Sequence, residues 1–157
     1  MDSAYQILLL VHGLSGLVAL ITFWVAASAK KGSPLHVLVG KTYMSAMLGI
    51  IVTALPMAAI IASRGNQGTA VFLAYLVVIT ASSMWLGRHS IRAKRDQSTF
   101  RGRGYLAVAV LNIVASIAVF TIGLQTSEVL LMGFSIVGIH NGTQMLIRRF
   151  RPLAMTR

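Results

Sequence analysis

The sequence contains no cysteine and only three acidic residues among its 157 positions. The absence of cysteine excludes disulfides, thiolate metal sites and cysteine nucleophiles. Charged residues make up 11% of the chain, whereas a soluble domain usually carries about 25%. So few charges cannot build a surface that faces water, and we therefore expect much of the surface to face lipid.

Charge is also absent from long parts of the chain. Five runs of 19 to 27 residues contain no Asp, Glu, Lys or Arg: 3–29, 42–63, 65–87, 104–127 and 129–147. A helix needs about 20 apolar residues to cross the hydrocarbon core of a bilayer. The sequence therefore predicts an all-α, polytopic membrane bundle, a single transmembrane domain over residues 1–157. Its five transmembrane helices are expected at about 5–28, 35–62, 70–88, 104–124 and 128–147.

The 14 Lys and Arg residues predict how these helices are oriented. With five crossings, thirteen of them lie on one side of the membrane and only Arg64 lies on the other. Basic residues favour the cytoplasmic side. We therefore expect the N-terminus outside and the C-terminus in the cytoplasm of a multi-pass protein of the bacterial inner membrane. The net charge of +11 then reflects topology, so nucleic acid is not an expected partner.

The basic segment from Arg88 to Arg103 has two interpretations. It is expected to contact anionic lipid headgroups, since each basic residue near such a surface contributes about 1 kcal/mol. It could equally serve only to set topology. Beyond the lipid bilayer itself, we also expect a membrane protein as a partner.

Cleavage of the first apolar run as a signal peptide is the alternative to a first transmembrane helix. Ala27 and Ala29 provide the small residues that such a site needs. However, the start, Met1-Asp2-Ser3, lacks a positive segment, and the apolar run exceeds the usual length of about 7–15 residues. We therefore expect this run to be retained as a helix.

Small and polar residues within the runs indicate how the helices could pack. Helices in lipid associate through small residues and interhelical polar contacts. The glycines expected at close contacts are Gly13, Gly16, Gly40, Gly138 and Gly142. The intramembrane polar residues are Asn112, Asn141 and Gln144. We expect these amides to face other helices and not lipid.

The apolar runs contain no carboxylate, which bears on function. Proton pumps and ion-coupled carriers usually hold an ionisable residue within the membrane. Paired carboxylates for acid–base catalysis and a buried acid for a Ser-His-Asp triad are also missing. The sequence thus predicts no catalytic residues and argues against a stand-alone enzyme.

The four histidines are the remaining candidates for chemistry: His12, His36, His89 and His140. In one interpretation they are structural and bond to side chains or backbone carbonyls across helices. In a second, two of them ligate the iron of haem b, either His12 with His140 or His36 with His89. In a third, His12 and His140 line a polar pocket for a quinone, a lipid or a small solute. Met44 and Met47 could suit Cu(I), but we interpret the methionines as packing residues and expect no metal site.

Two spaced patterns carry a resemblance to a known family. The first is His12-x3-Gly16-x2-Ala19-Leu20, and the second is Lys31-Gly32-x3-His36-x3-Gly40-x2-Tyr43-x3-Met47. Together with Tyr75–Ala81, they resemble a group of small bacterial membrane proteins classed as a domain of unknown function. The resemblance covers roughly residues 8–90 and implies a polytopic inner-membrane protein. It points to His12 and His36 and implies no particular activity.

Taken together, these patterns predict a binding or accessory component of a membrane complex. One alternative is an electron-transfer protein that binds haem b. The other is a transporter for a small solute or a lipid, which the lack of carboxylates in the spans disfavours.

Overall fold

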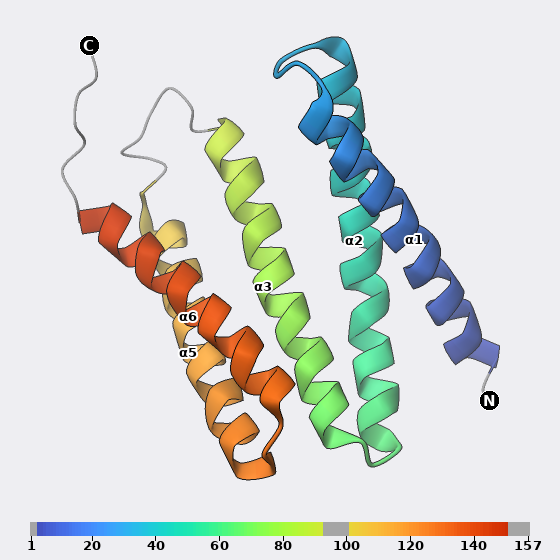
Figure 1. Ribbon diagram of the computed structural model, residues 1–157, viewed down its shortest axis with the longest axis vertical. Coiled ribbons are helices and arrows are strands. Elements are labelled where there is room, and N and C mark those ends of the chain that lie inside the picture. Colours follow the sequence, from blue (N-terminus) through green and yellow to red (C-terminus); the bar gives the residue numbers. More distant parts are fainter. Residues whose placement is uncertain (1–2, 93–100, 151–157) are drawn as a thin grey trace. The chain divides into compact units, whose positions relative to one another are not determined.

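The computed structural model describes residues 3–92 and 101–150, and most of them lie in five α-helices (Figure 1). The helices are α1 (Ser3–Ser28), α2 (Pro34–Ser63), α3 (Gln67–Arg92), α5 (Arg103–Thr126) and α6 (Val129–Phe150). Each is long and apolar enough to cross a membrane. The predicted all-α fold with five such helices is therefore confirmed. Residues 93–100 of the expected lipid-contacting segment and the basic tail at 151–157 lie outside the described residues.

The helices begin and end within four residues of the predicted limits, and the differences have a local cause. α3 and α6 continue past the apolar runs, to Arg92 and Phe150. Arg148 and Arg149 fall in the last turn of α6, where a positive charge interacts favourably with the helix dipole. Charge ends an apolar run without ending a helix, so hydropathy alone underestimates helix length.

The short connections of the first three helices follow from their residues. Gly32 (φ +83°) and Gly65 (φ +85°) adopt the left-handed conformation, which costs glycine little because it has no Cβ. Ser33 then caps α2, and its hydroxyl accepts a hydrogen bond from the His36 amide at 3.2 Å. Pro34 occupies the first turn of α2. A backbone N–H at this position would have no partner within the helix, so its absence in proline costs no hydrogen bond.

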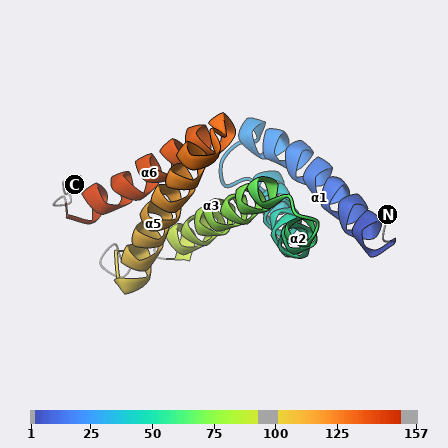
Figure 2. The same cartoon turned by 90° about the horizontal axis from the view of Figure 1, so that it is seen from below.

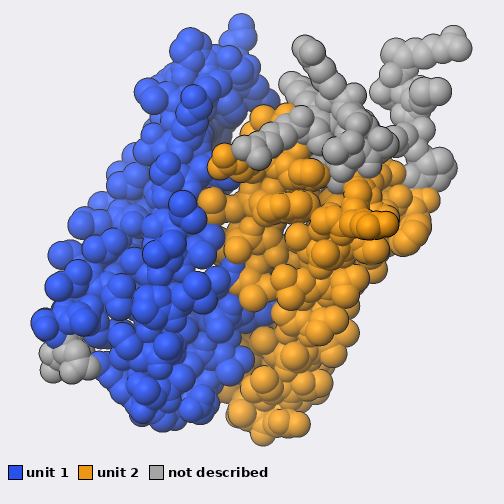
Figure 3. Space-filling view, turned by 180° about the vertical axis from the view of Figure 1, so that it is seen from behind, with its two compact units in different colours: residues 1–77 blue, residues 78–157 orange. Residues whose placement is uncertain are grey.

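The chain divides into two compact units, residues 1–77 and 78–157, with the boundary inside α3 (Figure 3). In the N-terminal unit, α1 and α2 pack against each other as an antiparallel hairpin. In the C-terminal unit, α5 and α6 form a second hairpin, which the second half of α3 accompanies. Figure 2 shows that the helices of each hairpin cross at an angle.

Burial is inverted relative to a soluble protein. In the C-terminal unit the least exposed side chains are small, and Ser116 and Ser135 are each 0% exposed. Large apolar side chains point outward instead, for example Val129 at 75%. In lipid, apolar side chains lose nothing by facing outward, and small residues let helices approach closely. These are the properties of a multi-pass membrane protein.

The contact between α5 and α6 depends on a glycine. A Cβ placed on Gly142 would lie 2.5 Å from Ile113 Cγ1 and 3.0 Å from the Ala109 carbonyl oxygen. Gly138, one turn earlier on α6, is also buried. The Gly-x3-Gly pair of α6 therefore lies on a buried face of this helix, and Gly142 is its point of closest approach to α5.

The contact between α1 and α2 lies elsewhere than expected. A Cβ on Gly49 would come within 2.8 Å of the Ser15 hydroxyl oxygen. A Cβ on Gly13, Gly16 or Gly40 would meet none of the described atoms within 4 Å. Gly49 and Ser15 thus form a close contact between the two helices that the sequence did not single out. Spacing identifies small residues, but it does not tell which face meets the neighbouring helix.

Candidate functional site

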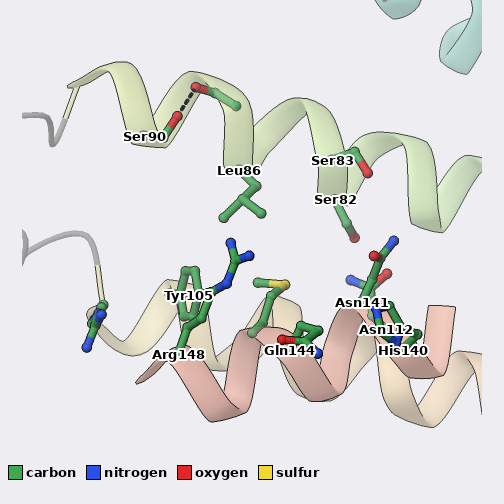
Figure 4. A pocket seen from close by; sticks show the side chains of 13 residues that line it. Ser82, Ser83, Leu86, Ser90, Tyr105, Asn112, His140, Asn141, Gln144 and Arg148 are labelled. Atoms are coloured by element: carbon green, nitrogen blue, oxygen red, sulfur yellow. Dashed lines mark hydrogen bonds between the residues drawn. The ribbon is translucent and has the colours of Figure 1, made fainter. Parts of the chain in front are cut away.

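The C-terminal unit contains a cavity of about 1040 Å³ between α3, α5 and α6. Figure 4 shows its lining side chains, which reach it from three helices and from the segment before α5. The lining residues are Ser82, Ser83, Leu86, Gly87, Ser90, Arg101, Tyr105, Asn112, His140, Asn141, Gln144, Met145 and Arg148. Most of these side chains are polar, although the helices that carry them are predominantly apolar.

Helical periodicity explains why these residues share one cavity. Residues three or four apart lie on the same face of a helix. On α3, the lining positions fall at 82–83, 86–87 and 90, and on α6 at 140–141, 144–145 and 148. At 1.5 Å per residue, the lining face of α6 from His140 to Arg148 extends about 12 Å. The cavity is therefore a groove bordered by two polar helix faces.

Amides and hydroxyls line the end of the cavity away from Arg148. Ser82 points toward Asn112 and Asn141 in Figure 4. Asn112 is only 4% exposed, and its Nδ2 donates to the Val108 carbonyl oxygen at 2.8 Å. Together these groups offer several hydrogen-bond donors and acceptors to a molecule in the cavity.

Basic residues lie at the other end of the cavity. Arg148 and Tyr105 are adjacent there, opposite Ser90 (Figure 4). The neighbouring Arg149 donates hydrogen bonds to the carbonyl oxygens of Arg101 and of Gly102, the latter at 2.8 Å. This contact joins the end of α6 to the segment before α5, so the side chains of Arg101 and Arg148 reach the same cavity.

An apolar cluster supports the basic end. Tyr105, Ala109 and Met145 are buried together between α5 and α6, and Leu86 of α3 packs against them. Trp85 packs on the start of α5, where a Cβ on Gly104 would lie 3.2 Å from its ring. These contacts hold α3 against the hairpin at the level of Tyr105.

His12, one of the predicted site residues, lies in the N-terminal unit and joins α1 to α2. Its Nδ1 is 2.9 Å from the Thr53 hydroxyl oxygen. The Thr53 hydroxyl oxygen also lies 2.7 Å from the Gly49 carbonyl oxygen and 3.1 Å from that of Ile50. His12 and Thr53 are thus hydrogen-bonded across the two helices. This is the arrangement that the structural interpretation of the histidines describes.

His36 also makes a hydrogen bond between elements. Its Nδ1 lies 3.0 Å from the Ala26 carbonyl oxygen and donates to it. Carbonyls in the last turn of a helix have no partner within the helix, and His36 satisfies one of them at the end of α1. Along α2, His36 and Thr53 are separated by about 25 Å, so His12 and His36 lie far apart in depth and cannot ligate one iron together.

The other two histidines belong to the C-terminal unit. His89 stacks on Trp85, with ring centroids 4.6 Å apart and an interplanar angle of 15°. His140 lines the polar cavity about one turn of α6 before Gln144. The two haem pairings, His12 with His140 and His36 with His89, each take one histidine from either unit, so neither unit by itself supports the haem interpretation. His140, Asn141, Gln144 and Asn112 are brought together in one cavity, whereas His12 lies in the other unit.

Several cavity residues were not among the sequence candidates, namely Ser82, Ser83, Ser90, Tyr105 and Arg148. The signal that could have found them is the spacing of serines and glycine on α3, which places a polar stripe on one face of an apolar helix. Arg148 was assigned to topology alone.

Comparison with known proteins gives no further assignment. The resemblance described from the sequence therefore stays a prediction. The chain matches no family model, no curated protein and no solved structure.

Proposed function

We propose that this chain is a binding component of the bacterial inner membrane that holds a small polar or amphipathic molecule in the cavity between α3, α5 and α6. The observation that carries the proposal is the convergence of polar side chains from three helices on one cavity. Polar groups within a bilayer are costly unless they are satisfied or used. The cavity volume, about 1040 Å³, is at the upper end of the range of about 300–1000 Å³ for sites of small molecules.

A binding role suits the chemistry of the lining better than a catalytic one. None of the lining residues that the structure describes is a carboxylate, and His140 supplies the one imidazole among them. General acid–base catalysis needs a positioned proton donor or acceptor, often more than one. Hydroxyls, amides and guanidinium groups, in contrast, recognise a ligand by hydrogen bonds and charge.

The placement in the membrane is part of the same proposal. The distribution of Lys and Arg favours an extracytoplasmic N-terminus and a cytoplasmic C-terminus. In that orientation, the basic end of the cavity, with Arg101 and Arg148, lies near the cytoplasmic surface. The other end of the cavity, with Asn112 and Asn141, lies within the hydrocarbon layer.

Native mass spectrometry of the tagged protein, extracted from bacterial membranes in a mild detergent, tests the binding role. The unmodified protein is expected to carry a bound molecule of defined mass. Ser83→Phe fills the cavity and Asn141→Leu removes a hydrogen-bonding group from it, so both variants should lose that mass. Ser45→Phe is the matched control, because Ser45 is exposed on α2, outside the cavity.

The melting temperature of each variant, measured in the same detergent, shows that loss of the molecule is not loss of the fold. An identical mass profile in all four proteins would contradict the binding role. The same preparation tests the accessory role, which requires that a partner protein co-purifies in mild detergent. Isolation of this chain alone at every detergent strength would contradict that part of the proposal.

A further inference from the structure

We infer that the cavity takes an oxyanion, a phosphate or carboxylate group, at its basic end, and that the rest of the molecule extends along the polar faces of α3 and α6. This inference rests on the proposed binding function and names the class of ligand. The group could belong to the headgroup of an anionic lipid or to a phosphorylated solute. Both sources present the same chemistry to the cavity.

The first step of the argument is the concentration of positive charge. Arg101 and Arg148 both line the cavity. Arg149 does not line it, but its hydrogen bonds to the carbonyl oxygens of Arg101 and Gly102 hold these segments together. A guanidinium group is always charged in a protein, so both side chains would attract an anion to this end of the cavity.

The second step is the type of the positive groups. A guanidinium group has a planar fork of donors that matches the oxygens of phosphate and carboxylate, and such bonds are about twice as strong as neutral ones. Tyr105 lies at the same end of the cavity as Arg148 (Figure 4). Ser90 also lies there, but its hydroxyl donates its hydrogen to the Gly87 carbonyl oxygen at 2.7 Å. Burial of Tyr105, which is 3% exposed, fixes the position of its ring beside Arg148.

The third step is the length of the polar face. From Arg148 the lining continues through Gln144 to Asn141 and His140, over about 12 Å, and Ser82 and Ser83 line the opposite side. An inorganic anion alone would leave most of these donors and acceptors without a partner. A ligand with hydroxyl, ester or amide groups next to its anionic group would use both parts of the cavity.

A simpler account is that these arginines only set topology, as basic residues near a membrane surface commonly do. The chain provides a control for this account. Arg103 is the first residue of α5, two positions from Arg101, but it does not line the cavity. Topology depends on the total charge of a segment, whereas binding in the cavity depends on which arginine is removed.

The experiment uses the full-length protein in nanodiscs of phosphatidylcholine. In one arm, phosphatidylglycerol is titrated into the discs, and bound lipid is counted by native mass spectrometry. In the other arm, glycerol 3-phosphate is added in solution and binding is measured by calorimetry. Arg101→Gln and Arg148→Gln are each expected to weaken binding by about tenfold, because a hydrogen bond to a charged group contributes roughly that factor. Arg103→Gln should bind like the unmodified protein.

The arm that responds identifies the source of the oxyanion. If Arg103→Gln lost as much binding affinity as Arg148→Gln, the inference would be overturned. Binding would then depend only on the overall positive charge of the protein surface. Binding of phosphatidylcholine that Ser83→Phe abolishes and Arg148→Gln leaves unchanged would also overturn it, while the proposed binding function would stand. If Ser83→Phe changes no binding in either arm, the proposed function itself fails.

Discussion

At the scale of single residues, side-chain hydrogen bonds of His12 and His36 join α1 to α2 in the N-terminal unit. His12 on α1 is hydrogen-bonded to Thr53 on α2, and Thr53 is buried. The hydroxyl of Thr53 is also bonded within its own helix, so its oxygen is held in a fixed direction. Such a contact orients α1 on α2 as well as stabilising the pair.

Substitution of this hydroxyl should be measurable. Thr53→Val keeps the branched shape but removes the hydroxyl that is hydrogen-bonded to His12 Nδ1. Hydrogen bonds between membrane helices contribute about 0.6 kcal/mol on average and at most about 1.7, so we expect a loss of this size in the free energy of unfolding. Titration with a denaturing detergent, followed by circular dichroism, measures it.

Thr53→Ser retains the hydroxyl and is the control for this substitution. The Val and Ser variants should differ when His12 is present and agree when His12 is replaced by Ala, because the double-mutant comparison isolates the pair. Equal stability of the two variants in the presence of His12 would show that the bond contributes nothing.

Functional assignment at the residue scale was only partly predictable from the sequence. Asn141, Gln144 and Asn112 stand out because an amide is unusual in an apolar run, and all three reach the cavity. Ser82 and Arg148 do not stand out, because serine is common in membrane helices and arginine is common at their ends. Their role depends on which face each helix turns toward its neighbours, and this is a property of the packed unit.

At the scale of helices, the α5–α6 hairpin is held by close packing of small residues. Gly142 has room for hydrogen only, since Ile113 and the Ala109 carbonyl fill the space that a Cβ would need. Gly133, on the same helix, has no described atom within 4 Å of such a Cβ. The two glycines thus differ in packing but share helix and residue type.

This difference predicts opposite effects of the same substitution. Gly142→Ala should destabilise the protein by about 1–3 kcal/mol, the usual cost of forcing an extra group into a packed interface. Gly133→Ala should be neutral or slightly stabilising, because alanine is the better helix former. The melting temperature in detergent reports both. Equal effects of the two substitutions would argue against the α5–α6 packing described above.

At the scale of the whole molecule, the number of helices could be predicted but their orientation remains to be measured. Hydrocarbon thickness fixes the length of a spanning helix, so a count of uncharged runs was sufficient for the number. The orientation of the helices depends on the side of the membrane on which the basic residues lie. The absence of native cysteine makes the chain suited to labelling at single introduced thiols.

We predict that Asn66→Cys and Thr126→Cys react with a membrane-impermeant maleimide in intact spheroplasts, because the proposed topology places both connections outside. Ser28→Cys should react only after permeabilisation, because it lies near the cytoplasmic connection of α1 and α2. All three residues are exposed. Labelling in the reverse pattern would invert the topology and place the basic end of the cavity outside.

The length of α2 has a consequence for the depth of this protein in its bilayer. Its 30 residues extend about 45 Å, well beyond the hydrocarbon thickness of about 30 Å. Lys41, in the second turn of α2, is followed by an uncharged stretch to Ser63, and that stretch extends about 33 Å. In the proposed topology, we expect the ammonium group of Lys41 to lie at the level where α2 leaves the headgroup region. Replacement of this lysine by leucine would let the helix slide or lean within the acyl layer, and membranes of different thickness would then set its vertical position.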